Sequence, residues 1–304
     1  MSGGAAGRWT GYLLLAAGMS VVGTYVALAK PLTAAFPVFL LAWLRFAIAS
    51  VVMIPWAIRG PGDVALDNRS RRALFVQSFF GNFLFSICML VGVSLTSATA
   101  SGVILSSLPA AVAALSWLFL RERVGWRVAV AVALAVAGLG ILTLGRAGTP
   151  GATSSAIGNL LVAGSVLCEA VYVILGKQLT ATLSPRRISA LINLIGLVLM
   201  SPLGLWQARD FAFGSVSVGV WGLLVFYALS ASVFSTWLWL SGLRHVPASH
   251  SGVFTLAMPI AASVVGVSFL GEHFGVAHLL AFGCAAVGIT LVTWPGRRAG
   301  AIPD

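Results

Sequence analysis

The chain carries one sequence pattern twice. Residues 101–143 align without a gap on residues 251–293, at an offset of 150 positions, and 13 of these 43 positions are identical. The identities include one proline, one glutamate and three glycines, which chance matches in an Ala/Val/Leu-rich stretch would not keep in register. Residues 11–30 likewise align on residues 158–177. The chain is therefore predicted to contain two copies of one unit, residues 1–148 and residues 149–304.

The composition predicts an all-α membrane protein. Hydrophobic residues make up 59% of the chain and charged residues 8%, against roughly 25% charged residues in a soluble domain. The apolar runs are about 20 residues long, which is the length that crosses a bilayer as a helix, and a membrane barrel would show short alternating segments instead. Ten transmembrane helices are predicted, at residues 9–29, 35–58, 73–94, 96–120, 125–144, 157–177, 186–208, 218–241, 247–270 and 275–294.

The placement of the basic residues predicts the orientation. Of the 18 Lys and Arg residues, 14 fall on the side that holds both termini, so both termini are expected in the cytoplasm, in a multi-pass protein of a bacterial-type inner (plasma) membrane. Five helices per copy is an odd number, so the second copy is expected to enter the membrane inverted. Lys30 and its equivalent Lys177 then lie on opposite faces, as do Glu122 and Glu272. Inverted repeats of this kind commonly bind substrate near the midplane.

Several functional classes are excluded or disfavoured. The net charge of +11 is spread over short islands, with no long or aromatic-interleaved basic run, so no nucleic-acid partner is expected. Cys88, Cys168 and Cys284 lie in apolar spans and are read as packing residues. No phosphate-binding loop, metal cluster or Ser/His/Asp set appears, so no metal, no cofactor and no enzymatic activity are predicted. An intramembrane transferase would need a second catalytic group near Glu169. The expected partners are the bilayer and a small molecule, with the protein a monomer or weak dimer.

Two spans carry equivalent prolines. Pro109 and Pro259 lie near the middle of the fourth and ninth spans, where a proline removes an intrahelical hydrogen bond and bends the helix. Membrane helices often tolerate a single proline. Because this pair is related by the repeat, a functional bend and a packing bend are both retained as explanations.

The end of the repeated unit resembles a known family. The pattern consists in the first copy of Ser101, Gly102, Pro109, Leu120, Glu122, Gly125 and Gly138, and in the second of Ser251, Gly252, Pro259, Leu270, Gly271, Glu272, Gly275 and Gly288. It resembles the EamA domain of the drug/metabolite transporter superfamily, present as a tandem pair, and Arg45-Phe46 resembles the arginine usual in that family's second span. The resemblance implies a ten-helix carrier, with YddG-type amino acid exporters as the favoured comparison. Glu169 stands where the family usually has a small or aromatic residue.

Two charged residues lie deep within spans. Arg45 and Glu169 occupy similar depths, and an unpaired charge there costs at least ~2.5 kcal/mol. One interpretation is a structural ion pair that locks the halves together. The other is that Glu169 contacts a substrate amine or carries a coupling proton. Arg45 aligns with Ile192 and Glu169 with Val22, so neither charge is repeated.

Polar side chains form a stripe on the third span. Ser78, Asn82 and Ser86 are spaced at i, i+4 and i+8, which places them on one helical face. The equivalent positions 232 and 236 of the second copy are also polar, and Gln77 aligns with Tyr227. Interhelical hydrogen bonds are the simpler explanation, and a shared substrate lining is the alternative. The remaining lining candidates are Tyr25, Tyr172, Ser232, Ser235 and Trp237, with lipid-facing packing as the alternative for Trp237.

Together these features predict a secondary transporter that exports amino acids, including aromatic or apolar ones, or similar small metabolites. Alternating access between the two halves would open a midplane cavity to each side in turn. Efflux of a lipophilic cation, held by Glu169 and tryptophan rings, is the alternative.

Overall fold

The computed structural model describes residues 3–28, 30–58, 65–95, 98–145, 155–269 and 275–294. These residues form α-helices, two π-helical turns and one 3-10 turn, and they contain no strand. Within the described residues, six helical stretches are long and apolar enough to cross a membrane: Val38–Ala57, Asn68–Met89, Ala156–Leu179, Pro185–Ala208, Val218–His245 and Val276–Thr293. The all-helical, multi-pass prediction is thereby confirmed for the described part of the chain.

The described elements fall on either side of residues 146–154. The first half contains α1 (Gly3–Leu28), α2 (Lys30–Ala35), α3 (Val38–Ala57), α4 (Asn68–Ser78), η1 (Phe79–Leu84), α5 (Phe85–Leu95), α6 (Ala98–Leu105), α7 (Leu108–Leu120) and α8 (Trp126–Gly145). The second contains α9 (Ala156–Leu179), α10 (Pro185–Ala208), η2 (Phe213–Ser215), α11 (Val218–Ala228), η3 (Leu229–Phe234), α12 (Ser235–His245), α13 (Ala248–Phe254), α14 (Ala257–Phe269) and α15 (Val276–Thr293). The short α2 and the turns η1, η2 and η3 were not predicted. Residues 146–154 of the predicted linker, and the side chains of Tyr25, Lys30 and Glu272, lie outside the described part.

At the starts of α4 and α3, side-chain oxygens accept hydrogen bonds from backbone N–H groups. Asp67 caps α4 by accepting a hydrogen bond from the backbone N–H of Ser70 at 2.8 Å, and hydrogen bonding from Ser70 holds the pKa of this exposed carboxyl below its usual value. At the start of α3, the Gln207 side chain accepts from the N–H of Leu40 at 2.9 Å. Both are donors that a helix start leaves unpaired.

Each of the two predicted proline positions lies just after a break in a helix. A turn at residues 106–107 interrupts the regular α-helix, and Pro109 lies in the first turn of α7. Residues 255–256 break the helix in the same way before α14, whose first turn contains Pro259. A proline is well tolerated in a first turn, because its missing N–H would have no partner there.

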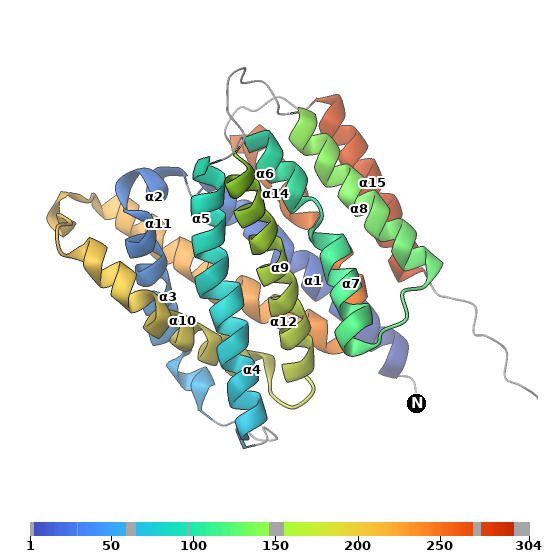
Figure 1. Cartoon of the computed structure of the whole chain (residues 1–304), viewed down its shortest axis with the longest axis horizontal. Helices are drawn as coiled ribbons and strands as arrows, with labels where there is room; N and C mark the ends of the chain where they lie inside the picture. Colours follow the sequence, from blue (N-terminus) through green and yellow to red (C-terminus); the bar gives the residue numbers. More distant parts are fainter. Residues whose placement is uncertain are drawn as a thin grey trace, which may run out of the picture.

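Each half inserts its first helix into the other half. Helix α1 packs against α12 and α14, and α9 packs against α5 and α7 (Figure 1). Glycines allow both contacts: a Cβ on Gly242 would lie 2.9 Å from Gly11 O, and one on Gly158 would lie 3.0 Å from Gly92 O. Small residues permit close backbone approach where lipid supplies no hydrophobic driving force.

A reciprocal contact also joins α8 and α15, which lie side by side at one edge of the molecule in Figure 1. A Cβ on Gly138 would lie 3.4 Å from Ala281 O, and one on Gly288 would lie 3.4 Å from Ala131 O. These four positions are related by the repeat offset of 150. Contacts in which i meets j and the equivalent of j meets the equivalent of i are those of a two-fold interface.

Replacing Gly242 by alanine is expected to lower the unfolding temperature of the detergent-solubilised protein. The added methyl group would lie 2.7 Å from Leu15 Cγ and 2.9 Å from Gly11 O, so α1 and α12 must separate, and overpacking of this kind costs roughly 1–3 kcal/mol. Gly222→Ala on α11 is the matched control, because no described heavy atom lies within 4 Å of a Cβ there. Equal unfolding temperatures for the two variants would contradict this packing role.

Candidate functional site

Two π-helical turns interrupt equivalent helices. In η1 the N–H of Phe85 donates to Phe80 O, and in η3 the N–H of Ser235 donates to Ser230 O. Both are i→i−5 bonds, and the two turns lie 150 residues apart. A π-turn widens the helix and disturbs the regular ladder of hydrogen bonds, and such turns occur frequently at functional sites.

The two turns are joined through α10. Asn82 on η1 donates through Nδ2 to Ile192 O at 3.1 Å, and Ser78 donates through Oγ to the same carbonyl at 2.8 Å. On the next residue, Asn193 donates through Nδ2 to Ser232 O at 3.3 Å. Gln77, Ser78, Asn82, Asn193 and Ser232 are called the polar junction below.

Helix α9 covers the polar junction on the side of η1. The ring of Tyr172 lies over Gly81, where a Cβ would come within 2.8 Å of Tyr172 Cγ. Gln77 donates through Nε2 to Tyr172 O at 3.2 Å. Gln77 is fully buried, and its Oε1 has no hydrogen-bond partner among the described residues. A buried acceptor without a partner is costly, which makes this oxygen a candidate to bind a ligand.

Glu169 lies on the same face of α9. Ser165 contacts Met89 of α5 at 3.7 Å, Tyr172 contacts η1, and Glu169 falls between them at helical spacings of four and three residues. Its side chain is partly exposed. It forms no hydrogen bond or ion pair with the described residues. Because a lipid-facing carboxylate is expensive, this side chain is a candidate to bind a ligand within the protein.

The ion pair considered between Arg45 and Glu169 does not form between these two described residues. The guanidinium of Arg45 lies 4.4 Å from the centre of the Phe46 ring. Helix α3 packs mainly on α10 and α11, whereas α9 packs on α5 and α7, so the two charges lie on helices with different neighbours. Similar depth in the membrane was therefore insufficient to predict contact.

The other predicted lining residues have varied surroundings. Ser235 is buried and donates to Ala231 O at 2.6 Å, which is a bond within its own helical turn. The ring centres of Trp237 and Trp56 lie 6.1 Å apart, and the Arg186 guanidinium carbon lies 5.6 Å from the centre of the Trp237 ring. Tyr227 is partly buried against an apolar cluster of α2, α3 and α11. Trp237 thus lies beside another aromatic ring and a guanidinium group, and Tyr227 lies beside apolar side chains.

Asn193 is the member of the polar junction that the sequence reasoning missed. The repeat gives no signal for it, because the equivalent residue in the first copy, Phe46, is apolar. The available signal is that Ser189 and Asn193 share one face of an apolar span, at a spacing of four residues. The π-turns have no comparable signal, since the spacing of their residues fits a regular α-helix equally well. Both features emerge from tertiary packing around α10.

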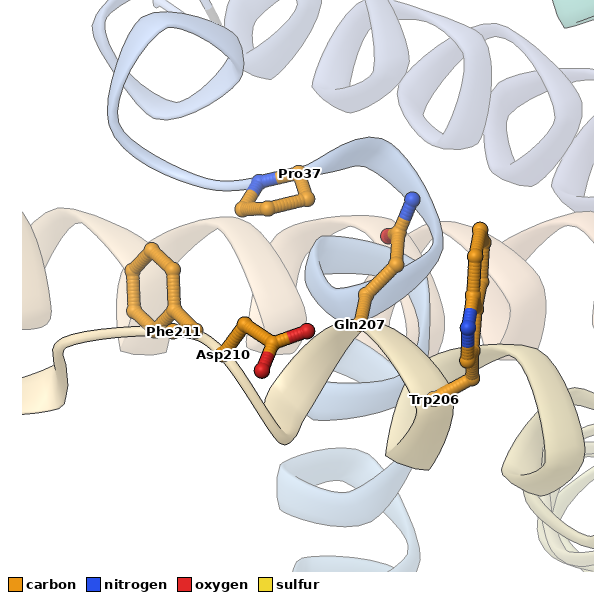
Figure 2. A pocket seen from close by; sticks show the side chains of 5 residues that line it. All are labelled: Pro37, Trp206, Gln207, Asp210 and Phe211. Carbon is orange, nitrogen blue, oxygen red and sulfur yellow. The ribbon is translucent and has the colours of Figure 1, made fainter.

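A recess of about 290 Å³ lies where α3 begins and α10 ends. It is lined by Pro37, Trp206, Gln207, Asp210 and Phe211. Figure 2 shows the Gln207 side chain reaching toward the start of α3, where it accepts the Leu40 N–H. Gln207 follows Asn193 by 14 residues, or roughly 21 Å along a helix, so this recess is separate from the polar junction. Among the described residues no group of three or more His, Cys, Asp or Glu could hold a metal ion.

Comparison with known proteins identifies the class to which this fold and site belong. The sequence profile described as the EamA-like transporter family matches residues 9–144 and again residues 156–294. The chain therefore belongs to this family, as two tandem EamA domains within the drug/metabolite transporter superfamily. It is a multi-pass membrane transporter.

The relatives agree with this assignment. The uncharacterized transporter YetK of Bacillus subtilis is 36% identical over 96% of this chain and 89% of its own length. An uncharacterized transporter of Archaeoglobus fulgidus is 25% identical over 83% of this chain and 87% of its own. One solved crystal structure superposes with a TM-score of 0.73 at 18% identity, with 96% of both chains covered, which shows that the fold is shared.

Replacing Gln77 by methionine is expected to leave the protein as stable as before or to stabilise it. The change keeps the length of the side chain and removes one 3.2 Å hydrogen bond together with the buried unpartnered oxygen. The lost bond is worth about 1 kcal/mol and the buried oxygen costs about 1–3 kcal/mol. Thermal unfolding measures stability, and transport in proteoliposomes measures function, with exposed Gln178→Met as control. Lost stability at unchanged transport would show that Gln77 is purely structural.

Proposed function

We propose that the chain is a ten-span secondary transporter built from two inverted five-helix repeats. In this arrangement α4–η1–α5, α6–α7, α11–η3–α12 and α13–α14 each form one span, and α1, α3, α8, α9, α10 and α15 supply the other six. The exchanged positions of α1 and α9, and the reciprocal glycine contacts of α8 and α15, support the repeat. The 14 basic residues on one side support cytoplasmic termini in a bacterial-type inner membrane.

The proposed cargo is an amino acid, including aromatic or apolar ones, or a similar small metabolite, exported by alternating access. The observation that carries this proposal is the unpaired, partly exposed carboxylate of Glu169 beside the polar junction. A substrate ammonium group would compensate that charge. The unpaired Arg45 near the middle of α3 is available for a substrate carboxylate, and an apolar side chain suits the surrounding walls.

Efflux of a lipophilic cation is the second candidate. Glu169 alone would hold such a cargo, with Tyr172 one turn away to offer a ring face. This candidate leaves Arg45 without a role in binding. The two candidates therefore differ in their dependence on Arg45.

Counterflow of radiolabelled methionine into proteoliposomes tests the proposal. The amino acid proposal expects uptake, competition by other zwitterionic amino acids, and strong loss in Arg45→Met. Competition by a cationic dye but not by threonine, with Arg45→Met unimpaired, would instead favour the lipophilic-cation candidate. Absence of counterflow for a full amino acid panel would overturn the amino acid assignment.

Glu169→Gln is expected to reduce methionine counterflow at least ~10-fold and to remove its dependence on pH, because the neutral amide neither compensates an ammonium group nor carries a proton. Glu169→Asp keeps the charge and is expected to retain part of the activity. Measuring rates between pH 5.5 and 8.5 in both variants separates a charge effect from a packing effect. If Glu169→Gln transports with an unchanged rate and pH profile, Glu169 has neither role.

A further inference from the structure

Two charged side chains, one just after α7 and one on α9, bind the turn between α12 and α13. Glu122, which follows α7, accepts the N–H of Ala248 through Oε1 at 2.8 Å and the N–H of Ser249 through Oε2 at 2.9 Å. Lys177, near the end of α9, donates through Nζ to Leu243 O at 2.7 Å and to Val246 O at 2.6 Å. The carboxylate thus binds the free donors of one helix start, and the ammonium group binds free acceptors at the preceding helix end.

The backbone at the end of α7 is shaped to deliver Glu122 to this turn. Arg121 adopts a left-handed conformation with φ of 53°, and among the described residues it is the one non-glycine residue with positive φ. The N–H of Glu122 then donates to Ser116 O at 3.3 Å. A left-handed residue commonly ends a helix, and in a residue other than glycine it costs roughly 1–2 kcal/mol. In the second copy, glycine stands at the equivalent position 271.

Tyr12 makes a further contact with the same region from α1. Its hydroxyl lies 2.9 Å from His250 Nδ1, and its ring stacks on Phe254 with centroids 5.3 Å apart. Below this layer, a Cβ on Gly252 of α13 would lie 3.1 Å from Pro109 Cα. Residues of the first half therefore close over α13 at the end of the molecule where Figure 1 shows the N-terminus and the ends of α7 and α9.

The opposite end is not closed in the same way. Helix α13 packs broadly against α7, whereas the equivalent helices α6 and α14 make no comparable contact among the described residues. Lys177 follows Glu169 by eight residues, or roughly 12 Å along α9, so these charged contacts lie well away from the candidate substrate site. A closed end and a less closed end, on either side of that site, are the arrangement that alternating access requires of each single state.

We propose that Glu122 and Lys177 form an end latch, which binds the α12–α13 turn in one transport state and releases it in the other. This proposal rests on alternating access as the proposed function. Both groups bind main-chain atoms of the turn while the latch is closed. When α13 moves away, both groups reach water at the membrane surface, so opening does not leave a charge stranded in lipid. Glu122 and Lys177 are positioning residues that set the balance of states.

Reactivity of a cysteine placed beneath α13 tests the latch in the full-length protein. Ser116 is fully buried and lies two turns beyond Pro109 on the same side of α7, so Ser116→Cys reports whether water enters below α13. The background variant replaces Cys88, Cys168 and Cys284 by alanine. In proteoliposomes, Glu122→Gln and Lys177→Met are each expected to raise labelling by a methanethiosulfonate reagent roughly tenfold. The double variant is expected to show no further increase, because either change opens the same latch.

Asp67→Asn is the matched control. Asp67 is also a carboxylate that caps a helix start, but it caps α4 within its own half, so labelling is expected to stay within about twofold. Hydrogen exchange at residues 246–255 is measured in parallel. Faster exchange there without faster labelling of residue 116 would show a local cap and overturn the latch. If Glu122→Gln does not fold, Glu122→Asp and Lys177→Arg are compared instead. Unchanged labelling of residue 116 in Lys177→Met would also overturn the latch.

The labelling readout needs no substrate, which separates the latch from the proposed cargo. Increased labelling with no amino acid counterflow would retain the latch and remove the cargo assignment. Normal counterflow with unchanged labelling in both charge variants would retain the cargo assignment and overturn the latch.

Discussion

The close crossing of α1 with α12, and of α9 with α5, is the contact on which the rest of the structure depends. In each crossing a glycine of one half lies against a backbone carbonyl of the other, at Gly242 with Gly11 and at Gly158 with Gly92. In lipid, helices gain little from burying apolar surface, so close backbone packing has to supply the association. These crossings set α9 against η1, and thereby place Tyr172 and Glu169 beside the polar junction.

Polar groups are distributed according to what each depth in the membrane tolerates. The polar junction uses neutral amides and hydroxyls bonded to main-chain carbonyls, such as Asn193 to Ser232 O, because neutral pairs are far cheaper to bury than charges. The charged contacts of Glu122 and Lys177 lie at one end, where water is near. Glu169 departs from this distribution, since its ionisable carboxyl group lies near the middle of α9 without a hydrogen-bond or ion-pair partner among the described residues. That departure is the reason for proposing a substrate site there.

The sequence was sufficient for some features of the candidate site and insufficient for others. Pro109 and Pro259 could be located because a proline has a local effect on its own helix. The polar stripe of Ser78 and Asn82 followed from helical spacing, and the structure joins these two residues at 3.2 Å. The pairing of Arg45 with Glu169 did not follow, because contact between residues far apart in the chain depends on which helices are neighbours. The role of Asn193 and the π-turns could not be predicted for the same reason.

What the sequence by itself determined is the all-helical, membrane-spanning and duplicated character of this transporter. Those properties depend on the length of apolar runs and on residue order, which are readable along the chain. Only the tertiary structure decided which ionisable groups are satisfied: Glu122 and Lys177 bind the α12–α13 turn, whereas Glu169 forms no hydrogen bond or ion pair with the described residues. The physical reason is that a charge in a membrane protein is stabilised by groups within a few ångströms, and the crossing of distant helices determines which groups those are.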